Sequence, residues 1–248
     1  MSRGRVAICA LIAMFLFAAL AGPAMAKKEY KKEFEASGPE VKLETSKVGT
    51  GVYEIILPFE EKGHLAKPYK FKCTELTKAT GEIHTTEGKA ESFTDKVTLG
   101  GCKKGRGKFA TLATISPIEF EFHANGTFSI LNEPKIQYEE DCYFVLDSGQ
   151  TVGKEEVEEG KKGPATYMQI GQSAPNGVPQ VEVKIKTRTH EEGEEDGLEY
   201  EGEGEGCVDQ EHKTEGGKMK ANFLVHGKST KENPWIGFKE ELLPKEKM

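Results

Sequence analysis

The sequence predicts an all-β protein, built as an antiparallel sandwich or as barrel-like sheets with charged, flexible termini. Three observations predict this fold class. Apolar and charged residues alternate in several short segments, Gly, Pro and Asn separate these segments, and no long segment has helical periodicity. A chain of 248 residues allows one large β domain or two small ones.

The alternation is clearest in two segments. At 69–73 two aromatic residues and a cysteine alternate with lysines, and at 181–185 three β-branched residues alternate with charged neighbours. A period of two gives a strand one buried and one solvated face. The predicted strands are 51–57, 69–76, 93–99, 109–115, 118–123, 127–131, 136–138, 142–146, 165–170, 181–187 and 222–225.

Residues 118–131 predict a β-hairpin around an Asn-Gly pair. A two-residue loop would set Phe122 opposite a serine and mix polar with apolar side chains. A three-residue loop at 124–126 sets Phe122 opposite Phe128 and keeps one face apolar. We therefore predict the three-residue loop, with Gly126 in a left-handed bulge conformation.

Residues 1–26 are typical of a cleavable secretory signal peptide. Arg3 and Arg5 precede an apolar run at 6–21, and Ala24-Met25-Ala26 matches the small-x-small cleavage pattern. The run is shorter than the roughly 18 to 20 apolar residues that a membrane-spanning helix needs. We predict cleavage between Ala26 and Lys27, a secreted or extracytoplasmic location, and no transmembrane segment in the mature chain.

The rest of the chain divides by composition. Residues 27–48 are highly charged and predict a mobile leader or linker, and residues 229–248 predict a charged C-terminal tail. The β domain is expected at 49–228. Segments starting at Pro117 and Pro179 resemble each other and each leads to a cysteine, so a division into two packed sub-sheets stays open.

Four cysteines remain after signal-peptide removal: Cys73, Cys102, Cys142 and Cys207. An even number in an exported chain indicates two disulfides with three possible pairings. Their spacing excludes a C-x-x-C zinc ribbon or thioredoxin-like site. We favour Cys73–Cys102 and Cys142–Cys207 over the other pairings and over four free buried thiols.

Charge and motifs exclude several functions. The net charge of −7 at pH 7 argues against nucleic acid as a partner, because phosphate contacts need basic surface. No G-x-S-x-G or metal-binding histidine spacing is present. The basic, glycine-rich segment 103–108 does not match the phosphate-loop pattern and is expected to be a solvated loop.

An acidic segment at 190–211 contains the candidate cation-binding residues Glu199, Glu201, Glu203 and Glu205. In an extended chain these four carboxylates would share one face, about 6 to 7 Å apart. Calcium takes such oxygen ligands, although the Asp-rich calcium-loop pattern is missing. A disordered, solvated loop is the competing interpretation, and contact with the basic segment 103–108 is the third.

Four short motifs carry a resemblance. Phe-Lys-Cys-Thr at 71–74, Gly-Cys at 101–102, Glu-Phe-Glu-Phe-His-Ala-Asn-Gly at 119–126 and Asp-Cys-Tyr-Phe at 141–144 are similar to those of uncharacterised exported proteins of actinobacterial type. This resemblance spans residues 51–227. It implies an exported, cysteine-bridged β fold and no particular activity.

These observations predict a secreted, non-catalytic β-rich protein with a structural, surface or binding role. The first alternative is a small-ligand-binding barrel, which an apolar cavity would favour. The second is an extracellular hydrolase, which convergent buried carboxylates would favour. A cell-surface component or a small molecule is the expected kind of partner, and calcium is the one cofactor considered.

Overall fold

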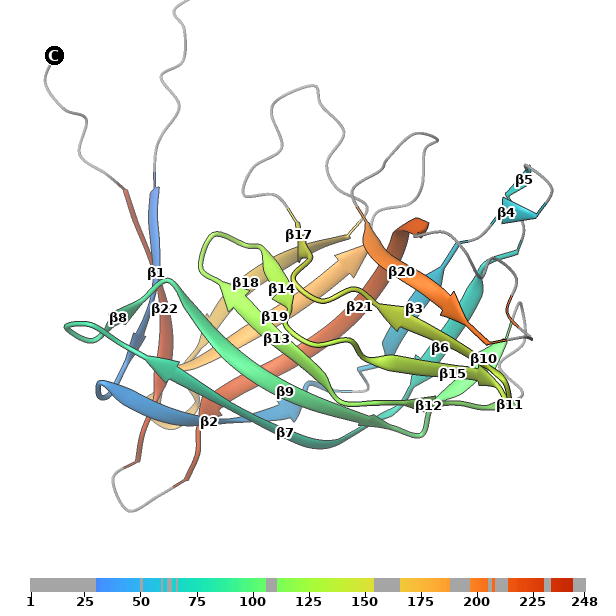
Figure 1. The fold of residues 1–248 in the computed structure, drawn as a ribbon. Coiled ribbons are helices and arrows are strands. Elements are labelled where there is room, and N and C mark those ends of the chain that lie inside the picture. The colour runs from blue at the N-terminus through green and yellow to red at the C-terminus, as the bar shows by residue number, and fades with distance from the viewer. Residues whose placement is uncertain are drawn as a thin grey trace, which may run out of the picture. The chain divides into compact units, whose positions relative to one another are not determined.

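The computed structural model describes residues 30–49, 51–58, 60–61, 64–65, 67–105, 111–153, 166–187, 197–204, 207, 214–229 and 233–242. The predicted signal peptide and its cleavage site lie outside these residues. Apart from one 3-10 turn at Pro175–Gly177, the regular structure described is strand, and its strand pairs are antiparallel (Figure 1). The all-β, antiparallel prediction is confirmed. Within the described residues no helix reaches the length and apolar character needed to cross a membrane.

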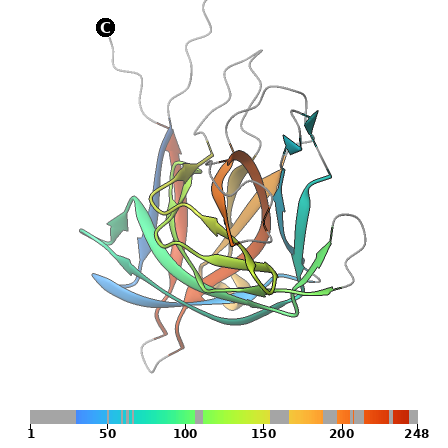
Figure 2. The ribbon, with the colours of Figure 1, turned by 45° about the vertical axis from the view of Figure 1, so that its right-hand side comes forward.

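One set of pairings, which we call the long-strand half, runs through nine strands. Its middle strands β2, β7 and β9 form a curved layer (Figures 1 and 2). In pairing order the strands are β17 (Thr151–Val152), β14 (Phe128–Ile130), β13 (Ile118–His123), β9 (Ser92–Gly100), β7 (Glu75–His84), β2 (Glu40–Lys47), the C-terminal part of β21 (Thr214–Gly227), β19 (Gln180–Thr187) and β18 (Thr166–Ser173).

The other set, the disulfide half, starts from the N-terminal part of the same strand β21. On one side the pairings lead through β3 (Tyr53–Leu57), β6 (Tyr69–Cys73) and β10 (Lys103–Gly105) to β11 (Thr111–Leu112). On the other they lead through β20 (Leu198–Glu203), β16 (Cys142–Leu146) and β15 (Lys135–Glu139) to β12 (Thr114–Ile115). Ala113 separates β11 from β12, and the sheets do not form a closed barrel.

Two small sheets complete the described structure. Strands β22 (Ile236–Leu242), β1 (Tyr30–Ala36) and β8 (Lys89–Ala90) form one, and β4 (Glu60–Glu61) pairs with β5 (His64–Leu65) in the other. Residues 32–240 make up one compact unit, to which both halves belong.

The predicted hairpin register is confirmed. Phe122 pairs with Phe128, and Phe120 with Ile130. Gly126 has φ of 91°, in the left-handed region that favours glycine. A side chain there would strain the turn that keeps both strands' phenylalanines on one face.

The structure differs from the sequence-based interpretation at both ends. The segment predicted as a mobile leader contains β1 and β2, and the predicted tail contains β22. Leu43 of β2 is only 1% exposed, and Ile236 of β22 is also buried. The high charge concealed a period of two: in β2 the apolar side chains point inward while Glu40 and Lys42 point to solvent.

Two aromatic clusters form the core. Tyr53 of β3 stacks on Phe223 at 5.4 Å between ring centroids, which links the halves at β21. The cluster of the long-strand half comprises Phe34, Phe93, Phe120, Phe122, Phe128 and Phe223, and that of the disulfide half Tyr69, Phe71, Tyr138, Phe144 and Tyr200.

Candidate functional site

The first disulfide joins two neighbouring strands. Cys73 ends β6 and Cys102 immediately precedes β10, and the two residues are bonded to each other. The adjacent pair Lys72 and Lys103 is in cross-strand register. The disulfide therefore extends the β6–β10 pairing by one covalent position, and the predicted Cys73–Cys102 pairing is confirmed.

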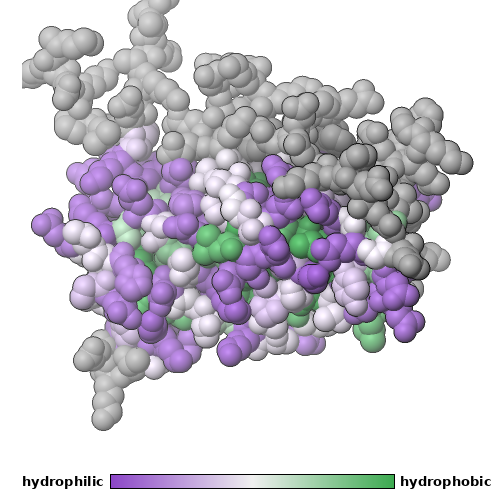
Figure 3. All heavy atoms as spheres, viewed as in Figure 1, coloured by the Kyte–Doolittle hydropathy of each residue, from purple (hydrophilic) through white to green (hydrophobic). Residues whose placement is uncertain are grey.

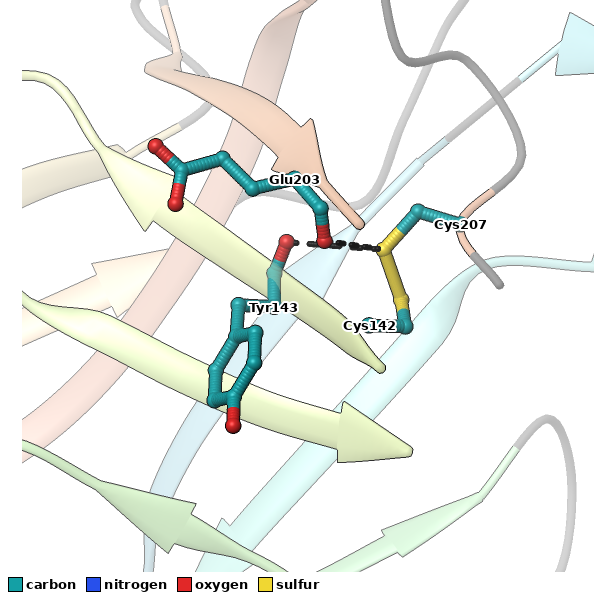
Figure 4. Close-up of a disulfide and its surroundings, with 4 residues drawn as sticks. All are labelled: Cys142, Tyr143, Glu203 and Cys207. Atoms are coloured by element: carbon teal, nitrogen blue, oxygen red, sulfur yellow. Dashed lines mark hydrogen bonds between the residues drawn. A yellow bond between two sulfur atoms is a disulfide. The ribbon is translucent and has the colours of Figure 1, made fainter. Parts of the chain in front are cut away.

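The second disulfide joins Cys142, the first residue of β16, to Cys207 beyond the end of β20, as predicted. The Cys207 sulfur lies 3.5 Å from the Tyr143 carbonyl oxygen and 3.2 Å from that of Glu203, two residues paired across β16 and β20 (Figure 4). Since a disulfide sulfur carries no hydrogen, we treat both as close sulfur–oxygen contacts. The link holds the end of the β16–β20 pairing together.

Both disulfides are buried, and their presence indicates an oxidising, extracytoplasmic environment. In a reducing cytosol such pairs would persist as thiols. The disulfides are therefore structural elements, and the location they indicate agrees with the predicted export.

Three of the four candidate cation ligands, Glu199, Glu201 and Glu203, lie on β20. Part of the acidic segment predicted as a solvated loop is therefore a strand, in which Leu198 and Tyr200 point inward and Glu201 and Glu203 are exposed. Figure 4 shows the Glu203 side chain pointing away from the disulfide, and its carboxylate pairs with Lys135 at 2.8 Å. Glu205 lies outside the described residues.

The described carboxylates of β20 are not grouped as metal ligands. Across the described part of the chain, no group of three or more His, Cys, Asp or Glu side chains is placed to hold a metal ion. The basic segment does not supply the partner of Glu203 either. Its residues Lys103 and Lys104 lie on β10, and the Lys104 ammonium lies 4.8 Å from the centroid of the Tyr138 ring. Residues 106–108 lie outside the described residues.

The outer face of the long-strand half carries interleaved opposite charges. Lys96 bonds to Glu119 at 2.5 Å across β9 and β13, and Lys184 pairs with Glu182 at 2.8 Å along β19. In the view of Figure 3, the described surface is dominated by hydrophilic side chains, with hydrophobic ones in small patches. Such paired, solvated charges contribute little to stability and provide no single-sign field for a charged partner.

A serine and a histidine meet on that outer face. The Ser129 hydroxyl of β14 lies 3.1 Å from Nε2 of His123, and a Glu121 carboxylate oxygen lies 3.9 Å from the same nitrogen. A nucleophile beside a base is the minimal arrangement for acyl transfer. In catalytic triads the acid instead holds Nδ1, the other ring nitrogen. Ser129 is also buried and shares a hydrogen bond with Thr151.

One cavity in the interior is lined by described residues of both halves. That cavity has a volume of about 10 Å³ and lies between Tyr53, Phe120 and Phe223. About 10 to 15 Å³ is needed to hold a single water molecule. The Tyr53 hydroxyl is buried without a hydrogen-bond partner in the described residues, and burial raises its pKa to about 12. The cavity does not favour the small-ligand alternative.

The structure also contains a buried carboxylate that the sequence analysis missed. Asp95 of β9 points into the long-strand half and is 2% exposed. Its Oδ2 accepts a 2.5 Å hydrogen bond from the Thr45 hydroxyl of β2, while Oδ1 has no partner in the described residues. Burial raises the pKa of this carboxyl to about 6, although the hydrogen bonds from Thr45 and from the Lys96 amide act in the opposite direction.

One signal in the sequence could have identified Asp95. Within 93–97 the inward positions of the alternation are Phe93, Asp95 and Val97, so an acid stands where the pattern requires an apolar residue. Comparison with known proteins gives no further guide, since no protein-family model, curated protein or solved structure matches this chain.

Proposed function

We propose that this chain is an exported, disulfide-stabilised, non-catalytic protein that acts through its outer surface, in a structural, surface or binding role. The observation that carries the proposal is the packed core of the described residues. Aromatic side chains occupy the core of both halves, and the characterised cavity is smaller than a ligand. This packing favours contact with a partner at the outer face of the sheets over binding inside the core. The two disulfides support a working place outside the cytoplasm.

Export and surface action can be tested on the secreted protein. N-terminal sequencing should start at Lys27, and non-reducing peptide mapping should return both disulfides. The purified, oxidised protein should then sediment with the envelope fraction of producing cells, while a reduced and alkylated sample should not. A protein that copurifies with a stoichiometric small molecule in native mass spectrometry would replace this proposal with the ligand-binding alternative.

The hydrolase alternative rests on the contact between Ser129 and His123. A fluorophosphonate probe, which reacts with activated serines, tests it on the intact protein. We expect no labelling, because among the described residues the acid beside His123, Glu121, lies near Nε2 and not near Nδ1, where a catalytic acid would hold the ring. Labelling that Ser129→Ala and His123→Ala abolish, and that the control Ser92→Ala keeps, would show instead that the protein is an enzyme.

A further inference from the structure

We propose that Asp95 is a buried proton-binding switch, which makes the fold of this protein more stable in mild acid than at neutral pH. The inference goes beyond the proposed function, since it concerns the conditions in which the fold persists and holds for any surface role. It rests on where the carboxylate lies, on what surrounds it and on a glycine that makes room for it.

The first step is the reach of the Asp95 side chain across a neighbouring strand. Strands β9 and β2 are separated by β7, so their backbones lie two strand spacings, or about 9 to 10 Å, apart. Asp95 and Thr45 nevertheless meet at 2.5 Å. Gly81 of β7 is the cross-strand partner of Asp95, and this gap in the inner surface lets the two side chains meet above β7.

Gly81 has no room for a side chain. A Cβ atom there would overlap the carbonyl oxygen of Thr94 and would lie 3.3 Å from the Asp95 Cβ. The glycine is therefore required by close packing and not by a positive φ. It and Asp95 together form a defined polar site inside an apolar layer.

The second step is the absence of a compensating charge in the described surroundings. From β13 the cross-strand neighbour of Asp95 is Phe120, from β7 it is Gly81, and from β2 the contact is Thr45. Strand β1 places Phe34 against Phe93 of β9, and the acid of β1, Glu33, is paired with Lys89 at 2.7 Å.

The remaining titratable group of this core is Tyr53, which packs against Phe223. Its hydroxyl is neutral at physiological pH, since burial raises its pKa to about 12. An ionised Asp95 would thus be a buried charge with the Thr45 hydroxyl and the Lys96 amide as donors and, among the described residues, no cation beside it. Burying such a charge is costly.

The third step is the sign of the pH dependence. The pKa of Asp95 is about 6 in the folded chain and 3.8 for an ordinary aspartate. Well below 3.8 both the folded and the unfolded chain carry the proton, and the contribution of Asp95 to stability is fully present. As pH rises towards 6 the unfolded chain loses its proton first, so the folded state is progressively disfavoured. The shift corresponds to about a 100-fold change in the unfolding equilibrium constant.

The Asp95→Asn variant tests the proposal, because its amide fills the same space, accepts the Thr45 hydrogen bond and stays neutral. Urea unfolding of the oxidised, mature protein would be measured from pH 3.5 to 7.5. The effect of the substitution should depend on pH: relative to wild type, the unfolding equilibrium constant of the variant should fall about 100-fold between pH 3.5 and pH 7.5. A difference that is constant with pH, or that grows towards acid, would overturn the proposal.

Two further measurements separate the switch from general effects of charge. Asp141→Asn removes an exposed carboxylate and should leave the pH profile of wild type unchanged. Thr45→Val removes the hydroxyl that favours the ionised form and should move the transition to higher pH. If Asp95→Asn does not fold, a carbon-13 NMR titration of the Asp95 carboxyl in wild type decides: a midpoint near 6 supports the switch and one near 4 refutes it.

Discussion

The long-strand half and the disulfide half differ in strand length, covalent linkage and core composition. In the former, β7 has ten residues and β9 nine, whereas β3, β6, β15 and β16 of the latter have five each. Both disulfides lie in the disulfide half. The core of the long-strand half is rich in phenylalanine, while tyrosines form much of the core of the other.

The difference shows how strand length and cross-links compensate for each other. A ten-residue strand between two neighbours forms many backbone hydrogen bonds and buries a long apolar row. A five-residue strand forms fewer backbone hydrogen bonds and buries a shorter apolar row, so its pairing is easier to lose. A disulfide reduces the entropy of the unfolded chain and stabilises the folded state without adding buried area. Four predictions test whether the halves really depend on these different sources of stability.

The largest effect is expected in the phenylalanine cluster. Phe120→Ala should destabilise the protein by about 3 to 5 kcal/mol, since it empties a fully buried site. Urea unfolding with and without dithiothreitol measures it. The stability lost by Phe120→Ala should simply add to the stability lost when the disulfides are reduced. For Phe144→Ala in the disulfide half, the two losses should not be additive. If both substitutions deviated equally from additivity with reduction, the proposed distinction between the halves would be wrong.

The disulfides come next. Replacing Cys142 and Cys207 together by alanine should cost about 2 to 4 kcal/mol, and replacing Cys73 and Cys102 somewhat less. The loops they close span 65 and 29 residues, which corresponds to a difference of about 0.7 kcal/mol in loop-closure entropy. Hydrogen exchange should rise in β16 and β20 and not in β7 and β9. Uniform loss of protection would contradict a local role.

A smaller loss is expected at a glycine of the long-strand half. Gly81→Ala should destabilise the protein by about 1 to 3 kcal/mol, because the added methyl group overlaps the strand next to it. Gly171→Ala on β18 is the matched control, since the nearest atom to its Cβ would lie 3.9 Å away. Thermal unfolding should separate the two variants. Similar thermal midpoints for the two variants would mean that the strands around Asp95 can shift to accommodate the added methyl group.

The smallest effect concerns the exposed carboxylates of β20. Calcium, a chelator and Glu203→Gln should each leave the melting midpoint of the protein unchanged, because Glu203 is exposed and pairs with Lys135 at the surface. A rise with calcium that Glu201→Gln and Glu203→Gln together abolish would establish a cation site, since a ligand of the folded state stabilises it by mass action.

The sequence predicts best where a single face is buried. The period of two located β13 and β19, and the requirement for one apolar face selected the correct register of the Phe122–Phe128 hairpin. The same signal was masked in β1, β2 and β20, where glutamate and lysine fill the outward positions and raise the charge of the whole segment. High average charge was interpreted there as disorder, although the inward positions are apolar.

The candidate site was less predictable for a different reason. The pairing of the cysteines was favoured correctly among three possibilities. The polar site of Asp95, Thr45 and Gly81 could not be assembled, because its members are brought together by strand order and not by spacing in the sequence. The alternation of apolar and polar residues shows which side chains of a strand point inward, but it does not show which distant strands pair with each other.

Strand β21 sets the time at which this fold can form. It is the single strand shared by both halves, and it pairs with segments near the start of the described chain; Ser46 and Leu224, for example, are 178 residues apart in the sequence. Long-range pairings of this kind form slowly, because distant segments must meet before the contact stabilises them. A chain made from its N-terminus cannot complete either half until β21 has been synthesised, so both halves become complete only late in its synthesis. For a chain exported in the extended state, as we propose for this one, this order of events would keep the fold incomplete until after transport.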